Sequence, residues 1–399
     1  MQRPIVILSH VATHAVCQGF LPAAQQSGQP LLILTDHAQE HWHHLADAGI
    51  AVDGLDILEC DVFNPLAVIE LLHAHGQRPR AVFSNSDHLQ TSCALVAEAF
   101  ACPGKDWRIC HAAKNKAEMR ERLQRLGLPG PWFRVLAPGA ALPVDAPFPL
   151  VAKPREGVAS LDVQLCHDAA ELADYCADFW QRQPNRALLL EAYLEGPLFT
   201  LETLGDGQSL QAIGGFDVTL SPPPHFVELE ARWNGPLSRA ARSAALAQVA
   251  AFGVNFGVCH SEFILTADGP VLVEINYRSI GDGREFLLDR LLPQGWFARI
   301  LALHLGEPLA EAQPSDAAAL VHYLVAPHGG QLRQTSASFS AEKAGYWTDY
   351  CALREAGEQI HLSHSNKDYL GVLRLIAPDE AALQAQFAAV RGDLRWELA

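Results

Sequence analysis

Acidic and amide side chains recur at alternate positions in two segments, CHSEFIL and PVLVEINYRS, which flank the turn sequence TADGP. If the hairpin pivots at Asp268, Glu262 faces Glu274 and His260 faces Asn276 on the same side, because side chains alternate between the faces of a strand. Like charges placed opposite each other destabilise a sheet, and Mg²⁺ between the two carboxylates would remove the repulsion. The pattern predicts a metal site formed by Glu262, Glu274 and Asn276, with a solvated polar face as the alternative.

The rest of the second segment completes this prediction. Arg278 follows on the polar face, where a guanidinium is placed to clamp a phosphoryl oxygen. An ordinary Glu–Arg pair is the alternative. The opposite, apolar face is expected to supply the core through Val271, Val273, Ile275 and Tyr277.

Lysines are scarce, with six among 29 basic residues, so a lysine in an apolar setting needs its own explanation. Lys153 ends the run PFPLVAKP, where a buried ammonium needs a partner such as a nucleotide phosphate. Lys116 lies in the first turn of an expected helix, where a cation opposes the helix dipole unless it points at a bound anion. Residues 155–160, with Gly157 and Ser160, could fold over phosphates. A surface loop and a snorkelling lysine remain the alternative for this segment.

The run ALLLEAYLEGP predicts a strand that ends near Glu191. The chain that leaves this strand could offer a backbone C=O and N–H to an adenine edge, and Glu191 could approach the adenine amino group. An ordinary buried strand end fits the same letters. The residues concerned are Glu191, Ala192, Tyr193 and Leu194.

Alternating apolar runs and helix-like stretches in the first hundred residues predict a parallel sheet with covering helices. No glycine-rich dinucleotide fingerprint follows the first strand, since Gly19 stands alone, and a ribose-binding role for Asp36 is therefore disfavoured. The expected strands are Ile5–Ser9, Leu31–Thr35, Ile57–Cys60 and Ala81–Asn85, and the expected helical segments are Thr13–Ser27, Ala38–Ala48, Pro65–His75 and Leu89–Phe100.

A helix with a clear start signal follows, because Asn115 is a good N-cap and Glu118 has capping-box spacing from it. Met119, Leu123 and Leu126 are expected to form one buried stripe of this helix. A second strand-rich unit comes after a connector rich in proline, alanine and glycine. We expect strands at Leu150–Lys153, Leu161–Leu165, Leu188–Glu191, Phe199–Leu204 and Gln211–Asp217, helices at Ser238–Phe252 and Asp379–Val390, and a proline-rich loop at Ser221–His225.

The bulk composition narrows the class of protein. A net charge of −16 argues against a protein that binds the nucleic-acid backbone. No apolar run is long enough for a membrane span, and nine cysteines without a C-x-x-C pair suggest reduced thiols in the cytoplasm. His41 and His44 could form a metal pair beside His43, but a solvated helix face is favoured because no third ligand is evident.

The order of these motifs resembles the ATP-grasp superfamily over the whole chain. Lys116, Lys153, Glu191 and the hairpin follow one another at plausible spacings. The resemblance implies an α/β fold that is α+β in its C-terminal part. It implies a pre-ATP-grasp domain with a parallel sheet over residues 1–110, a nucleotide-binding catalytic domain over 111–308 and a small α+β domain over 309–399.

Within the superfamily the chain looks most like L-amino acid ligases, through the loop PPPHFVELEARWNGPL and the H-S-E strand. The resemblance implies that Lys116 and Lys153 contact phosphates, that the segment 191–194 holds adenine, and that Arg278 stabilises phosphoryl transfer. His260, Arg232, His225 and Arg284 are candidates for contact with the substrates. His260 could instead only order the metal face.

The sequence departs from the family pattern at three places. Leu198 stands where the family often has a ribose-binding glutamate, and Glu195 and Glu202 are the candidates to substitute for it. The loop EGVASLDV lacks the usual extra glycine and arginine after Ser160. The glycine pair after the arginine appears as Gly281-Asp282-Gly283, so Asp282 and Arg284 could shape the substrate end.

The expected chemistry is an ATP-dependent ligation that uses Mg²⁺ or Mn²⁺. A small-molecule carboxylate, such as an amino acid or a precursor of a secondary metabolite, becomes an acyl phosphate and is joined to an amine. No nucleic-acid or membrane partner is expected, and the resemblance suggests a homodimer. A carboxylase acting on bicarbonate and a non-catalytic ATP-binding protein remain alternatives.

Overall fold

The structure is a computed structural model that describes residues 3–157, 161–311 and 313–399. Its N-terminal part is a four-stranded parallel sheet in the order β3-β2-β1-β4. The apolar runs of β1 and β2 are buried at every position, as expected for parallel strands that are covered on both faces. The strands are β1 (Ile5–Leu8), β2 (Leu31–Thr35), β3 (Leu55–Glu59) and β4 (Ala81–Phe83), and the helices are η1 (Ala15–Phe20), α1 (Leu21–Gln26), α2 (Ala38–Asp47), α3 (Pro65–Ala74) and α4 (Gln90–Ala99).

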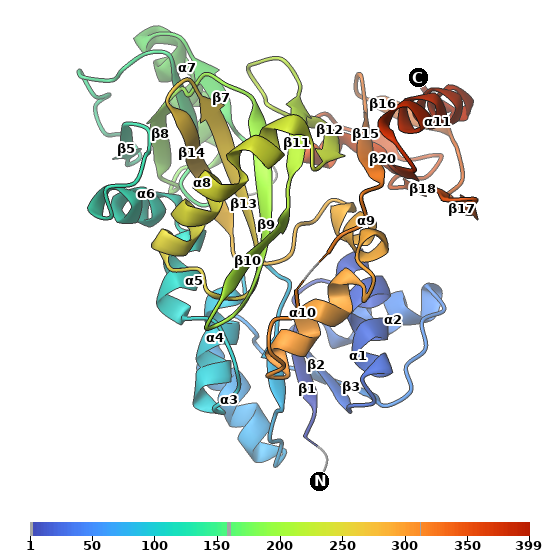
Figure 1. The fold of residues 1–399 in the computed structure, drawn as a ribbon. Helices are drawn as coiled ribbons and strands as arrows, with labels where there is room; N and C mark the ends of the chain where they lie inside the picture. The colour runs from blue at the N-terminus through green and yellow to red at the C-terminus, as the bar shows by residue number, and fades with distance from the viewer. Residues whose placement is uncertain (1–2, 158–160, 312) are drawn as a thin grey trace.

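The lone Gly19 has a packing role in this part. A Cβ added at Gly19 would lie 2.4 Å from the ring of Phe297, which belongs to α10 (Trp296–His304). The Phe297 ring also lies 4.9 Å from that of Phe20. A helix from far along the chain therefore covers the N-terminal sheet, since α10 contacts α1, η1 and β4, and Figure 1 shows it beside α1.

A small antiparallel sheet, in the order β5-β8-β6-β7, forms a lobe with one helix at the upper left of Figure 1. The strand expected over 161–165 begins later, at Gln164, because Asp162 in the preceding turn has a positive φ. In the helix before the lobe, Leu126 is exposed rather than buried, since it follows the last helical residue and precedes Gly127. The elements are α5 (Trp107–Lys114), α6 (Lys116–Arg125), β5 (Phe133–Leu136), β6 (Leu150–Pro154), β7 (Gln164–Cys166), α7 (Ala169–Arg182) and β8 (Leu188–Ala192).

A large antiparallel sheet of ten strands runs through the rest of the molecule. The single strand expected over 211–217 is two strands, because the pairing shifts near Gly214 and Gly215 lies against the carbonyl of Thr200. The strands along the sheet are β14 (Gly269–Asn276), β13 (Phe256–Thr266), β9 (Leu198–Asp206), β11 (Phe216–Leu220), β12 (Glu228–Trp233), β15 (Ala318–Val325), β20 (Tyr369–Ala377), β18 (Tyr346–Ala352) and β17 (Phe339–Lys343), with β10 (Leu210–Gly214) on β9.

The C-terminal part continues this sheet, because β15 pairs with β12. The domain boundaries expected at residues 110 and 308 remain a prediction. Within the described ranges, no helix has the length and apolar character needed to cross a membrane. The remaining elements are α8 (Pro236–Phe252), α9 (Arg284–Leu291), β16 (Gly330–Thr335), β19 (Gln359–Ile360), η2 (Asn366–Asp368), α11 (Glu380–Asp393) and β21 (Trp396–Leu398).

One face of the large sheet is apolar where α8 packs against it. Phe199, Leu201 and Phe263 join Val249 and Phe252 of α8 in a single buried cluster. Alternation along β9, β13 and β14 then turns the intervening side chains toward the opposite face. That face carries the candidate site.

Candidate active site

The hairpin of β13 and β14 brings the predicted carboxylates together. Glu262 pairs with Glu274 and His260 with Asn276, as expected. The pivot at Asp268 was wrong, because the turn contains two residues between the paired Thr266 and Gly269. A bulge at Val273 adds one residue to β14 and restores the expected partners farther along the strands.

The bulge also changes which side chains face the core. Ile275 and Tyr277 are buried in the cluster beneath the sheet, as predicted. Val273 was assigned to that face wrongly, since it lines a cavity beside Glu274 and Leu272 takes its place in the core. The carbonyls of Leu272 and Val273 accept hydrogen bonds from the buried guanidinium of Arg120, at 3.2 and 2.6 Å. Arg120 was not predicted from the sequence.

A row of polar side chains crosses the sheet at His260. Glu202 of β9, His260 of β13 and Asn276 of β14 lie in register. His260 contacts Glu202 through Nδ1 at 2.8 Å and Glu262 through Nε2 at 3.4 Å. Burial opposes the imidazolium, but Glu202 and Glu262 raise the pKa of His260 to about 9. His260 is therefore a cation at neutral pH, which favours ordering of the carboxylate face over acceptance of a proton.

Two cavities meet at the carboxylates. The first, here called the lobe cavity, lies between the small sheet and the hairpin. The second, here called the sheet-edge cavity, lies between the hairpin and the carboxyl ends of the N-terminal strands. Glu228, Glu262 and Glu274 line both cavities.

Lys116 closes one end of the lobe cavity. Its Nζ lies 2.8 Å from Oε1 of Glu274 and 2.9 Å from the carbonyl of Gly157. Burial opposes its charge, but the Glu274 carboxylate outweighs burial and raises the pKa of Lys116. Lys116 therefore holds the residue-157 turn against the hairpin. The expected contact of Ser160 with phosphate lies outside the described residues.

Lys153 enters the same cavity from β6 as part of a buried triad. Val151 pairs with Glu191 across β6 and β8, so Lys153 lies diagonally from Glu191 on one face. The Glu191 carboxylate lies 2.5 Å from Lys153 and 2.5 Å from Arg120. Burial opposes its charge, but the two cations lower the pKa of Glu191 to about 2.

This triad changes the role expected for Glu191. Each carboxylate oxygen already accepts from a cation, so Glu191 holds Lys153 rather than reaching freely toward an adenine amino group. Burial still lowers the pKa of Lys153, and Glu191 offsets this only in part. An ammonium that is only partly neutralised favours a further anion in the cavity.

The remaining walls of the lobe cavity are mostly apolar. Tyr193 lies with its ring 6.2 Å from that of Phe226, which the proline-rich loop supplies. Leu198 lines this wall, whereas Glu195 and Glu202 do not. The carboxylate of Glu202 contacts His260 instead. A flat heteroaromatic ring fits between such walls. The apolar and backbone lining comprises Pro131, Val151, Leu161, Val163, Ala192, Tyr193, Leu194, Leu198, Leu220, Phe226, Ile264 and Val273.

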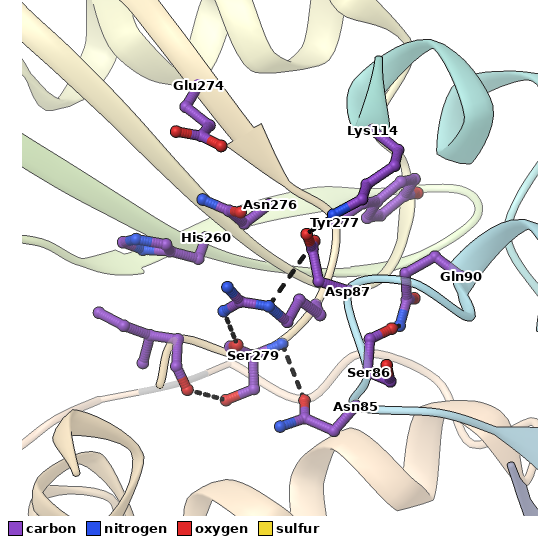
Figure 2. A network of polar contacts seen from close by, with 12 residues as sticks. Asn85, Ser86, Asp87, Gln90, Lys114, His260, Glu274, Asn276, Tyr277 and Ser279 are labelled. Atoms are coloured by element: carbon purple, nitrogen blue, oxygen red, sulfur yellow. Dashed lines mark hydrogen bonds and ion pairs between the residues drawn. The ribbon is translucent and has the colours of Figure 1, made fainter. Parts of the chain in front are cut away.

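Arg278 lines the sheet-edge cavity directly after β14, and the N-terminal part holds it in place. Its Nε lies 3.7 Å from Oδ1 of Asp87, which also pairs with Lys114. Figure 2 shows Asp87 and Lys114 meeting to the right of Asn276, with Asn85, Ser86 and Asp87 on one segment after β4. The cations lower the pKa of Asp87 to about 2 despite its burial.

Further contacts lock the backbone around Arg278. The N–H of Ser279 donates to Asn85 at 3.2 Å, and the carbonyl of Tyr277 accepts from the buried Lys105 at 2.5 Å. Arg278 donates from Nη1 to the carbonyl of Ser279 at 2.8 Å. Contacts made by the residues before and after Arg278 thus fix the position of its guanidinium.

The other candidates for substrate contact divide into two pairs. Arg284 lines the sheet-edge cavity and pairs with the buried Glu228 at 2.8 Å, while His260 lines it beside Glu262. The structure does not bring Arg232 or His225 to either cavity. Arg232 pairs instead with Glu230 and Glu380, and His225 stacks on His364 with ring centres 4.3 Å apart.

The donor set of the hairpin fits a hard divalent cation. Glu262 and Glu274 present carboxylate oxygens from opposite strands, and Asn276 lies 3.4 Å from Glu262 through its amide. Mg²⁺ and Mn²⁺ prefer such oxygen ligands and keep further positions for phosphate oxygens. Glu262, Glu274 and Asn276 would hold the ion at the boundary of the two cavities.

Among the histidines of α2, His43 is exposed, as a solvated helix face predicts. His41 is buried instead, with an exposed fraction of 1%, and lies near the backbone of His10 after β1. The sequence analysis also missed a nearby group, His10, Asp36 and His37, whose ligand atoms lie within 4.8 Å of one another. His10 lines the sheet-edge cavity.

Comparison with known proteins adds to this geometry, although no protein-family model matches the chain. The chain is similar to the uncharacterized protein y4rH of Sinorhizobium fredii, at 23% identity over 414 residues, which covers 100% of this chain and 84% of that protein. It is also similar to carnosine synthase 1 of Gallus gallus, at 29% identity over 302 residues and 67% of this chain. The match spans only 32% of that synthase.

The solved structure of an L-amino acid ligase from Bacillus licheniformis has the same fold. It matches with a TM-score of 0.79 and 18% identity, over 100% of this chain and 99% of that one. The resemblance seen in the ordered motifs and the fold found here agree. The chain has the ATP-grasp fold.

Proposed function

We propose that the protein is an ADP-forming ligase that converts a small-molecule carboxylate into an acyl phosphate and joins it to an amine. ATP lies in the lobe cavity, and the two substrates lie in the sheet-edge cavity. One observation carries the proposal, namely that the two cavities share a wall of carboxylates beside Arg278. Phosphoryl transfer across that wall connects a nucleotide on one side with a carboxylate on the other.

The residues divide the work between binding and charge neutralisation. Lys116 and Lys153 contact phosphates, and the backbone from Ala192 to Leu194 contacts adenine between apolar walls. A metal ion bound by Glu262, Glu274 and Asn276 neutralises phosphate oxygens. Arg278 binds a phosphoryl oxygen and the developing charge at the acceptor carboxylate.

Relatives support the type of bond that is formed. The similar proteins include a carnosine synthase and an L-amino acid ligase by name. We therefore place an amino acid, or a metabolite related to one, among the substrates. Arg232 and His225, which were first expected to contact a substrate, do not line the sheet-edge cavity. Arg284 remains a candidate for substrate contact there, beside Glu228.

The test is ADP and phosphate release with ATP and Mg²⁺, measured across a matrix of carboxylates and amines. We expect release that requires one carboxylate and one amine together, with a loss of about 10³-fold or more in Glu274→Gln. Glu121→Gln, on the exposed face of α6, is the matched control and keeps full activity. ADP release that needs neither a carboxylate nor an amine, or unchanged release in Glu274→Gln, would contradict the proposal.

The alternatives from the sequence give distinct results in the same matrix. Bicarbonate-dependent release without an amine would identify a carboxylase. ATP binding with no release for any pair would favour a non-catalytic protein. The proposed homodimer and cytoplasmic location rest on the resemblance and on nine free cysteines, and sedimentation and cell fractionation test them.

A further inference from the structure

The proposed ligation leaves one proton without an acceptor, and this inference rests on that proposed function. At neutral pH an amine substrate is largely an ammonium ion. The attacking nitrogen forms the C–N bond, the C–O bond to phosphate breaks, and phosphate leaves with the electron pair. Of the three ammonium protons, one stays on the amide and one ends on the departing phosphate. The third must pass to a base and then to solvent.

The residues already assigned do not supply this base. Both ring nitrogens of His260 are engaged, Nδ1 with Glu202 at 2.8 Å and Nε2 with Glu262 at 3.4 Å. Glu262 and Glu274 are committed to the metal face and to Lys116. A base must therefore come from elsewhere in the sheet-edge cavity.

Three further histidines of the described chain line that cavity, and they differ in their partners. His88 lies near Lys114 and Arg278, and burial and these cations lower its pKa. His14 lies with its ring 6.4 Å from that of His44, and burial lowers its pKa too. His10 is the member of this group that is paired with a carboxylate.

The His10–Asp36 pair has the geometry of an oriented base. Nδ1 of His10 lies 2.7 and 2.8 Å from the two oxygens of Asp36. A proton held on Nδ1 by a carboxylate leaves Nε2 as the proton acceptor. β1 and β2 are paired in parallel, and both residues follow these strands at the carboxyl edge of the sheet, where ligands of α/β folds bind.

Neighbouring groups fix the ring and connect it to solvent. The ring of Phe63 lies edge-on at 5.0 Å, and that of His37 at 4.9 Å. The side chain of His10 is 34% exposed, so a proton taken in the cavity can leave to water. The titratable and charged groups that face it are Asp36 and His37 after β2, His41 of α2, and His88 after β4.

We propose that His10, oriented by Asp36, accepts the proton of the attacking amine. It thereby places the amine at the carboxyl edge of the N-terminal sheet, opposite Arg278. The rival is Glu285, a buried carboxyl that lines the same cavity and whose pKa burial raises to about 7. Glu285 has an exposed fraction of 4% and one oxygen without a hydrogen-bond donor, so it has neither the orienting partner nor the route to solvent.

The test separates the two halves of the reaction by the nucleophile supplied. Hydroxylamine is largely uncharged at pH 7 and traps an acyl phosphate as a hydroxamate without a base. An ammonium substrate needs the base. Both products are measured with ATP, Mg²⁺ and the carboxylate found in the ADP-release screen, over pH 6.5 to pH 9.5.

We expect His10→Gln to keep hydroxamate formation and to lose about 10²-fold in amide formation at pH 7. The loss shrinks as the pH approaches the pKa of the amine. Asp36→Asn shows the same pattern with a loss of about 10-fold, because His10 remains but its tautomer is no longer held. His43→Gln, on the exposed face of α2 and outside both cavities, is the matched control and forms both products at the wild-type rate.

Three results would overturn the assignment of His10. Equal losses of hydroxamate and amide in both His10→Gln and Asp36→Asn would show a purely structural role. An unchanged amide rate in His10→Gln would exclude it as the base. A selective, pH-dependent loss in Glu285→Gln alone would assign the role to Glu285. If the wild type forms no hydroxamate, the proposed ligation itself is contradicted, and the role of His10 in it is contradicted too.

Discussion

The lobe cavity and the sheet-edge cavity share three glutamates, but Lys153 and Arg278, one from each cavity, are held by ion pairs that differ in burial. Lys153 pairs with Glu191, which also pairs with Arg120, and the side chains of Glu191 and Arg120 are 7% and 1% exposed. Arg278 pairs with Asp87, which also pairs with Lys114, and the side chains of Asp87 and Lys114 are 15% and 25% exposed. Charges that are deeply buried depend strongly on their partners, whereas partly exposed ones are stabilised by water as well.

The two cavities also differ in where their residues come from. The lobe cavity is built by the small sheet and by neighbouring strands of the large one, between residues 116 and 274. The sheet-edge cavity is assembled from the N-terminal strand ends, the hairpin and the C-terminal strands. We infer that the phosphate-handling side is the fixed part of the molecule and that the substrate side is the part free to vary.

The largest effect that this comparison predicts is on folding, from Arg120→Met. The substitution leaves the carboxylate of Glu191 with one cation and the carbonyls at the Val273 bulge without a donor. We expect a loss of about 3–5 kcal/mol in the free energy of unfolding, measured by urea denaturation. Arg125→Met, on the exposed side of the same helix, should change it by less than about 0.5 kcal/mol. Similar values for both variants would show that the buried pair of Arg120 and Glu191 does not stabilise the fold.

A second prediction concerns pH and the row that crosses the sheet. The folded-state pKa of His260 is about 9, above its unfolded value of about 6.5. Its stabilisation is therefore fully present below pH 6.5 and is lost as the pH rises through 9, by up to about 3 kcal/mol. Urea denaturation between pH 6 and pH 10 should show this decline in the wild type. In Glu202→Gln the decline should be much smaller, whereas the exposed Glu195→Gln should keep it. An equally steep decline in Glu202→Gln would show that Glu202 does not hold the charge.

The third prediction separates binding from folding within the lobe cavity. Lys153→Met removes the ammonium that we propose contacts phosphate and leaves Glu191 paired with Arg120. We expect ATP affinity to fall by about 30-fold, or about 2 kcal/mol, in calorimetric titration. KM values for the carboxylate and amine should change by less than about 2-fold. Unchanged ATP affinity would place the nucleotide elsewhere.

The smallest effect is expected in the sheet-edge cavity, from Asp87→Asn. The variant weakens the ion pairs with Lys114 and Arg278, each of which is partly exposed. We expect about a fivefold fall in kcat with ATP affinity unchanged, which corresponds to about 1 kcal/mol. Steady-state kinetics measure both quantities, and Asp56→Asn, on an exposed position of β3, is the control. A fall in ATP affinity as large as that for Lys153→Met would show that the two cavities do not act independently.

The sequence predicted the hairpin partners well, because alternation and turn residues limit how two strands can pair. The facing of Glu262 and Glu274 was predicted correctly, yet by a pivot that was wrong by half a residue. The bulge at Val273 compensated for that error. Its only signal lies in tertiary structure, since Arg120 binds the carbonyls that the bulge exposes.

Residues set by contacts distant in sequence could not be predicted in the same way. Arg120 lies four residues after Lys116, so both cations occupy one side of α6, which is a signal that went unused. His10 and Asp87 follow β1 and β4 near the carboxyl edge of the sheet, where ligands bind. His225 has a polar side chain in the correct loop, but Phe226 is the residue that reaches the lobe cavity.

The most direct test of the account follows one oxygen atom through the reaction. The carboxylate substrate is labelled with oxygen-18 and incubated with ATP, Mg²⁺ and the amine, and the phosphate released is analysed by mass spectrometry. An acyl phosphate formed across the shared carboxylate wall predicts ADP and one labelled oxygen in the phosphate for each amide made. Unlabelled phosphate, or AMP with pyrophosphate in place of ADP, would contradict the transfer that both cavities are proposed to serve.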